Sequence, residues 1–103
     1  MTKNNKLVRD NIPDIIIKAG KSPIYHVIKE DKEYLNQLLI KLIEEANEVK
    51  DNPSKEELAD VMEVVLAIAE YLKLDIKAVE EYRKLKSNKN GAFKKRYFLE
   101  SVN

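Results

Sequence analysis

The sequence predicts an all-α fold, a bundle of about four helices that forms a single domain over residues 1–103. Its length of 103 residues suffices for one modest hydrophobic core. Only two glycines and three prolines are present, so the chain offers few of the tight turns that a fold with many strands requires. Apolar residues recur at three- and four-residue intervals over long stretches, and this is the spacing of one face of a helix.

The first helix is expected to begin near Asn11 and to end at Gly20. Pro13 falls in its first turn, where the missing N–H of proline is harmless. The β-branched and aromatic residues of 24–28 favour a short extended segment after this helix. The C-terminal tail, 93–103, could be extended or helical, and its pattern does not decide between the two.

The second helix is expected between Asp31, its predicted N-cap, and about Lys50. Its apolar residues fall on one stripe, formed by Leu35, Leu38, Leu39, Leu42, Ala46 and Val49. At about 100° per residue, Glu45 borders this stripe, Glu48 lies close beyond it, and Glu44 points away.

The third helix should be capped by Ser54 and should be central, because residues 58–69 are apolar on nearly every side. The fourth should begin at residues 74–75 and end within 88–91. Its expected inner face consists of Ile76, Val79, Tyr82 and Leu85.

Two pairs of acidic residues on the second and third helices suggest a metal site. Glu45 and Glu48 are neighbours on one helix face, as are Glu57 and Asp60. If the helices are antiparallel, the pairs can face each other, and their mutual repulsion would then call for a cation. Carboxylates are ligands that suit Mg²⁺, which keeps waters for a phosphate substrate. Glu57 has an alternative role, because Ser54 and Glu57 also form a capping-box pattern.

These residues carry a resemblance to a known family. The chain resembles the MazG-like all-α nucleoside triphosphate pyrophosphohydrolases in the motif Glu44-Glu45-Ala46-Asn47-Glu48 followed by Glu57-Leu58-Ala59-Asp60. That superfamily also includes phosphoribosyl-ATP pyrophosphohydrolases and dimeric dUTPases. The segments 6–13 and 90–96 look like those of a small phosphoribosyl-ATP-pyrophosphohydrolase-like branch. Gly91-Ala92 departs from the two glycines expected there.

The resemblance implies an enzyme that hydrolyses a nucleotide between its α- and β-phosphates, giving a monophosphate and pyrophosphate. House-cleaning of non-standard nucleotides is one such role. The Mg²⁺ ligands would be Glu45, Glu48, Glu57 and Asp60. Glu44 and Glu45 would form the catalytic pair, with Glu44 orienting the attacking water or taking its proton.

Charge is strongly segregated along the chain, although the net charge is only +1. Residues 44–63 hold eight acids and two lysines, whereas 83–96 hold seven bases and no acid. A triphosphate on an acidic metal site needs cations on its other side. We therefore expect substrate contacts from among the basic residues, with Lys6, Arg9, Lys89 and Arg96 as the candidates. For any single lysine, a solvated surface position is the alternative interpretation.

Two other functions are compatible with the sequence. The chain could be a non-catalytic, self-associating helical module that has kept a metal site, because so apolar a helix favours a homo-oligomer. Nucleic-acid binding through residues 83–96 is disfavoured by the acidic helices. The chain has no cysteine, begins with a polar segment and lacks an apolar run of the roughly 20 residues that span a bilayer. The expectation is a cytoplasmic protein without a membrane partner.

Overall fold

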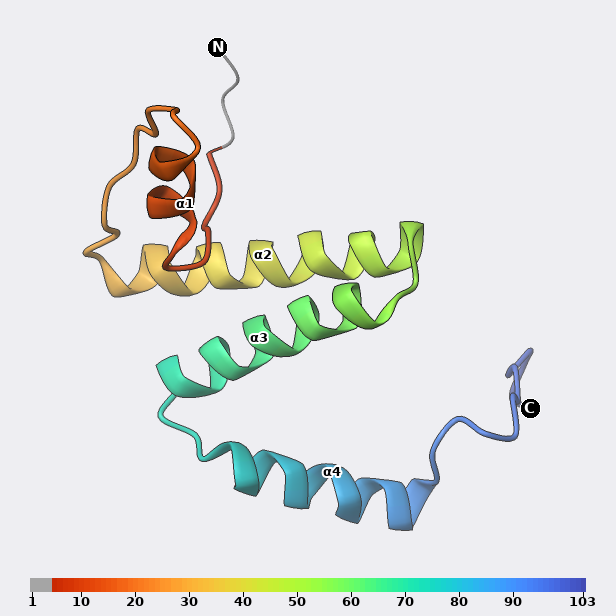
Figure 1. Cartoon of the computed structure of the whole chain (residues 1–103). Coiled ribbons are helices and arrows are strands. Elements are labelled where there is room, and N and C mark those ends of the chain that lie inside the picture. The colour runs from red at the N-terminus through yellow and green to blue at the C-terminus, as the bar shows by residue number, and fades with distance from the viewer. Residues whose placement is uncertain (1–4) are drawn as a thin grey trace.

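The computed structural model describes residues 5–103 and confirms the all-α prediction. Its four helices are α1 (Ile12–Lys18), α2 (Asp31–Asp51), α3 (Lys55–Tyr71) and α4 (Ile76–Asn90) (Figure 1). Residues 24–28 and the tail beyond residue 93 form neither helix nor strand. The extended segment expected at 24–28 therefore finds no strand partner within the described residues. None of the described helices is long and apolar enough to cross a membrane.

The N-terminal part of the described chain consists of α1 and two irregular segments. Pro13 lies in the first turn of α1, and Gly20 follows the helix at a φ of +83°, a backbone conformation that glycine adopts without strain. Residues 21–30 then lead to α2 without regular structure. The segment before α1 comes down beside α2 (Figure 1), and this approach places it close to the acidic residues.

α2 and α3 form an antiparallel pair joined by a short turn (Figure 1). Asp31 is the first helical residue of α2, and the N-cap is Glu30, which makes no capping hydrogen bond, so the prediction that Asp31 caps this helix was wrong. At the start of α3 the prediction is confirmed, because Ser54 accepts a hydrogen bond from the Glu57 backbone N–H at 3.2 Å.

The buried core is small and lies mainly between α2 and α3. Among the described residues only Leu38, Val64 and Ala69 are buried. Leu39 and Ala46, expected on the buried stripe of α2, are exposed. The reason is geometric: α3 covers α2 on the side centred on Leu38, and Leu39 lies about 100° round the helix from that side.

α3 ends in a hydrogen-bonded cap that turns the chain into α4. The Leu74 N–H donates to the Ala69 carbonyl and the Lys73 N–H to the Glu70 carbonyl, while Lys73 adopts a φ of +58°. This is a Schellman motif with a lysine at the left-handed position, where glycine is usual. Asp75 then caps α4 by accepting from the Lys77 N–H at 2.9 Å.

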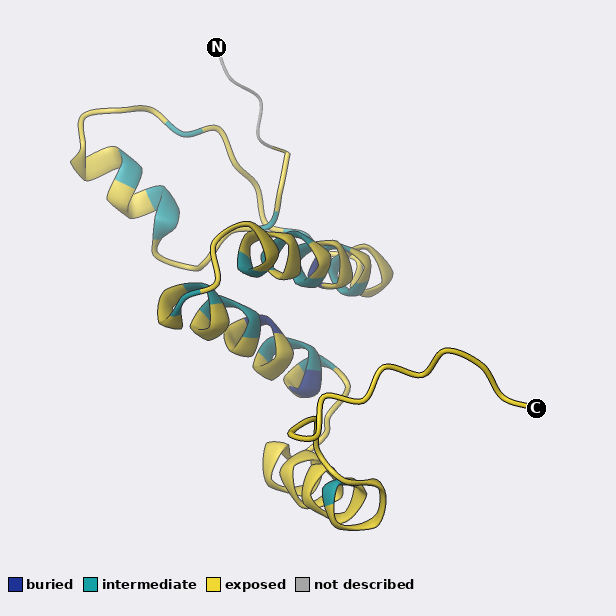
Figure 2. Ribbon diagram, turned by 90° about the vertical axis from the view of Figure 1, so that its right-hand side faces the viewer, coloured by how far each residue is buried: buried dark blue, intermediate teal, exposed yellow. Residues whose placement is uncertain are grey.

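α4 touches α3 near their junction and then diverges from it, so much of both helices is uncovered (Figures 1 and 2). The expected inner face of α4 (Ile76, Val79, Tyr82 and Leu85) is not buried, with exposures of 38–65%. The chain measures 58 × 31 × 26 Å, and its radius of gyration is 17.9 Å. A compact domain of about 100 residues has a radius of gyration of roughly 13 Å.

Candidate metal centre

Three carboxylates from two helices meet near the α2–α3 turn. Glu45 of α2 and Glu57 and Asp60 of α3 each offer an oxygen that lies within 4.8 Å of the other two. All three side chains are partly buried. They converge because Glu57 and Asp60 lie three residues apart on α3, on the side that faces α2. We call these three residues the carboxylate triad.

The capping of α3 leaves the carboxylate of Glu57 available to the triad. Ser54 accepts from the Glu57 backbone N–H, which is one half of a capping box. The reciprocal bond, from the Ser54 backbone N–H to the Glu57 carboxylate, does not form among the described residues. The backbone N–H of Glu57 therefore takes part in capping α3, while its carboxylate belongs to the triad.

Within the triad, burial and neighbouring like charges both act on the carboxyl group of Glu57. Burial raises the pKa of Glu57 above its ordinary value of 4.5, and the charges of Asp60, Glu48, Glu45 and Glu56 raise it further. A divalent cation would relieve this repulsion. Since every donor is a carboxylate oxygen, the set suits a hard cation such as Mg²⁺. These residues fit the ion that the acidic pattern predicts.

Glu48, the fourth predicted ligand, lies outside the triad. Its side chain is exposed, yet its charge contributes to the raised pKa of Glu57. Glu48 is thus a close neighbour of the site in this structure and not part of its innermost group. The structure brings together three of the four predicted ligands.

Glu44 lies beside the triad residue Glu45 and is held by two lysines, with 32% of its side chain exposed. Its Oε1 accepts a hydrogen bond from Lys41 Nζ at 3.3 Å and forms an ion pair with Lys6 Nζ at 3.6 Å. Lys41 Nζ also lies 3.3 Å from Oε1 of Glu45, and only 16% of the Lys41 side chain is exposed. Lys41 therefore links the two carboxylates that were predicted to be catalytic.

Lys41 was not among the site residues predicted from the sequence. The signal was present, because Lys41 precedes Glu44 by three residues and Glu45 by four, the two spacings at which helical side chains meet. Its side chain is less exposed than those of Lys6 and Arg9, the other two described cations that pair with acids of this cluster.

Arg9 reaches the triad from the segment before α1. Its Nη2 donates a hydrogen bond to Oδ1 of Asp60 at 2.7 Å. Together with Lys6, it brings positive charge to the acidic cluster from a distant part of the chain. Both of these predicted substrate-binding residues lie at the site, and each is paired with a carboxylate.

The other two predicted substrate contacts lie elsewhere. Lys89 is in the last turn of α4, and Arg96 is in the tail at a φ of +61°. Over residues 5–103 neither forms an ion pair with an acidic residue. Gly91 ends α4 at a φ of +88°, whereas Ala92 does not require a positive φ, so the missing second glycine causes no strain here.

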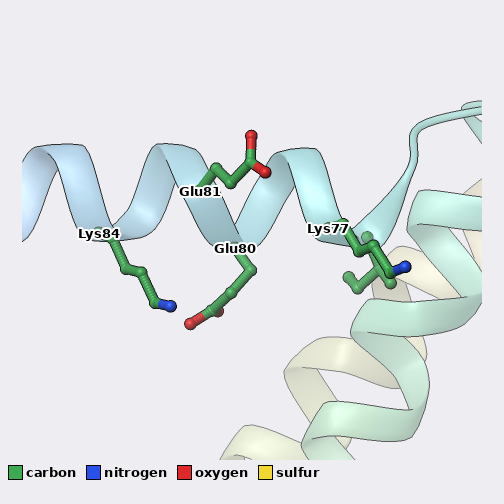
Figure 3. A pocket seen from close by; sticks show the side chains of 5 residues that line it. Lys77, Glu80, Glu81 and Lys84 are labelled. Atoms are coloured by element: carbon green, nitrogen blue, oxygen red, sulfur yellow. The ribbon is translucent and has the colours of Figure 1, made fainter.

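Two surface hollows lie away from the triad. One is a shallow depression on α4, where the side chains of Lys77, Glu80, Glu81 and Lys84 spread from the helix (Figure 3). The other lies within the curve of the tail, residues 90–98. The charges on α4 already satisfy one another in part, because Arg83 Nε donates to Glu80 at 3.0 Å. Neither hollow is lined by a residue of the triad.

Comparison with known proteins does not place the chain in a family. No family model, no curated protein and no solved structure matches it. Function must therefore be argued from the site itself.

Proposed function

We propose that this chain is a Mg²⁺-dependent nucleotide pyrophosphohydrolase. It would hydrolyse a nucleoside triphosphate or a similar nucleotide between the α- and β-phosphates, with water adding across the cleaved bond to give a monophosphate and pyrophosphate. The observation that carries the proposal is the triad of Glu45, Glu57 and Asp60, whose oxygens lie within 4.8 Å of one another. The motif resemblance supports the same reaction.

The triad would hold the metal, and Glu48 would join it or bind a second ion at its edge. Bound Mg²⁺ would neutralise charge on the phosphate oxygens and lower the pKa of a water, which supplies the nucleophile. The other catalytic functions would belong to the side chains around the metal. Glu44 would orient this water or take its proton, and Lys41 would hold Glu44 and Glu45 in place.

Arg9 and Lys6 supply the cations that a polyphosphate requires on the side away from the metal. A guanidinium binds two phosphate oxygens at once, whereas an ammonium acts as a mobile point charge. In this structure both are paired with carboxylates of the cluster. A metal ion bound to Asp60 would compete with Arg9 for this carboxylate. The guanidinium of Arg9 would then be free to bind a phosphate.

The test is pyrophosphate release from a panel of standard and non-standard nucleotides, with and without Mg²⁺. Release should require the metal, and Asp60→Asn should abolish it while the helical circular dichroism signal is kept. Asp14→Asn is the matched control, because Asp14 is an exposed acid whose ion-pair partner within residues 5–103 is Lys18 on α1. Full activity of Asp60→Asn would refute the assignment.

The second candidate is a self-associating helical module with a retained metal site. It is favoured by the large apolar side chains that the chain leaves exposed on α3, such as Met62 at 66%. Metal binding without turnover of any nucleotide would select this function over hydrolysis. Under both candidates we propose that the chain works as a homo-oligomer, in the cytoplasm and without a membrane or nucleic-acid partner.

A further inference from the structure

Lys41 differs from the other two cations of the site in its place in the chain and in its exposure. Only 16% of its side chain is exposed, against 43% for Lys6 and 55% for Arg9. Lys6 and Arg9 reach the acidic residues from the segment before α1, whereas Lys41 is on α2 itself. Its ammonium group therefore stays with the acidic residues of α2 wherever the N-terminal segment lies.

The ammonium group of Lys41 lies between two carboxylates that have different roles in the proposed site. Its Nζ donates a hydrogen bond to Oε1 of Glu44 at 3.3 Å and lies 3.3 Å from Oε1 of Glu45. Glu45 belongs to the triad, and Glu44 does not. Because these side chains are largely shielded from water, the attraction between them is weakly screened. Lys41 therefore fixes Glu44 relative to a metal ligand.

Without this ammonium group, α2 would offer a place for a second divalent ion. Glu44 and Glu48 lie four residues apart and share one face of the helix. Glu48 is exposed beside the triad, so an ion there could keep the waters that Mg²⁺ retains. Lys41 competes with such an ion, because it brings positive charge to Glu44 and occupies one of its oxygens.

The charges of the site balance with a single divalent ion. The acidic residues of the motif carry five negative charges, on Glu44, Glu45, Glu48, Glu57 and Asp60. Three positive charges are paired with acids of this set, on Lys6, Arg9 and Lys41. The remaining charge of −2 equals in size the charge of one Mg²⁺ ion. A second ion would therefore leave an excess of positive charge.

We infer that Lys41 is a positioning residue whose ammonium group takes the place of a second metal ion. It keeps Glu44 free of metal, as the carboxylate that orients the water, and leaves one divalent ion at the triad. Of the two roles proposed for Glu48, joining that ion is the one that remains. The inference rests on the metal site of the proposed function and not on turnover. One bound ion without hydrolysis would refute the hydrolase alone, whereas hydrolysis with two bound ions would refute this inference alone.

The number of bound Mn²⁺ ions tests the inference, because Mn²⁺ suits the same carboxylate ligands as Mg²⁺. Electron paramagnetic resonance of the free ion should give one bound Mn²⁺ per wild-type chain and two per chain for Lys41→Gln. Lys41→Arg should bind one, because it restores the positive charge. Lys32→Gln is the matched control, since Lys32 is an exposed lysine of α2 roughly 20 Å along the helix from Glu45. One ion in Lys41→Gln, or any number other than one in the wild type, would overturn the inference.

Amine labelling of the wild-type chain covers the case in which Lys41→Gln does not fold. A reagent that acylates exposed lysines should modify Lys41 more slowly than Lys32, as mass spectrometry of the digested protein would show. Saturating Mg²⁺ should leave this protection unchanged, because the ion binds at the triad while Lys41 stays on Glu44. Labelling of Lys41 that becomes faster with Mg²⁺ would show that the metal displaces the ammonium group, and would overturn the inference.

Discussion

Replacing Arg9 by glutamine should tighten Mg²⁺ binding and weaken nucleotide binding at the same site. The structure pairs Arg9 with Asp60 at 2.7 Å, so the guanidinium and the metal compete for one carboxylate. Removing the competitor frees Asp60 for the ion. The same change removes a cation that the proposal assigns to the phosphates, so turnover should fall.

The exposure of this ion pair sets the size of the effect. The side chains of Arg9 and Asp60 are 55% and 38% exposed, and pairs this accessible contribute at most about 1 kcal/mol. Mg²⁺ affinity should therefore rise by no more than about five-fold in Arg9→Gln. By the same estimate, the free energy of unfolding without metal should fall by no more than about 1 kcal/mol.

Isothermal titration of the metal-free protein with Mg²⁺ measures the affinity, and pyrophosphate release measures turnover. Arg83→Gln is the matched control, because it breaks an arginine–carboxylate pair with Glu80 on α4, away from the triad. Unchanged or weaker Mg²⁺ binding by Arg9→Gln, relative to this control, would show that Arg9 does not compete with the metal.

Three further predictions concern stability. Ser54→Ala removes the cap of α3 and should cost about 1 kcal/mol in the free energy of unfolding, measured by urea denaturation; no loss would mean that the cap is dispensable. Lys73→Gly relieves the left-handed backbone at the end of α3 and should stabilise the protein by roughly 0.5–1 kcal/mol in the same assay, whereas a destabilised variant would contradict the Schellman cap. The raised pKa of Glu57 means that, just above pH 4.5, the folded chain holds a proton that the unfolded chain has released. The free energy of unfolding in a chelator should therefore fall as pH rises through this window, and Glu57→Gln should reduce that fall; identical pH profiles for the two proteins would contradict it.

The helices and several of their ends follow from local patterns. Ser54 and Asp75 cap their helices because a short polar side chain can reach a backbone N–H two or three residues ahead. Asp31 shows the limit of this reasoning, since an acid at the start of a helix can cap it or occupy its first turn. The spacing of Glu57 and Asp60 likewise predicted that they share a face.

Contacts between distant parts of the chain were less accessible to prediction. Arg9 was a candidate phosphate ligand, but its pairing with Asp60 spans 51 residues and depends on where the segment before α1 crosses α2. Glu44 was placed by the orientation of its own helix, and its partner Lys6 lies on another segment. Helical periodicity predicts the position of a side chain on its own helix. It does not predict which residues of other segments contact that side chain.

The sequence alone was sufficient for the all-α class, for the acidic pairs on two helices and for the excess of apolar surface on α3. Hydrogen bonding within a helix is local, so spacing and caps carry this information. Packing of α3 against α2 around Leu38 and Val64 decided which carboxylates meet: Glu45 joined Glu57 and Asp60, and Glu48 remained at the edge. The reason is that the rotation and tilt of two packed helices depend on burial between residues far apart in the chain.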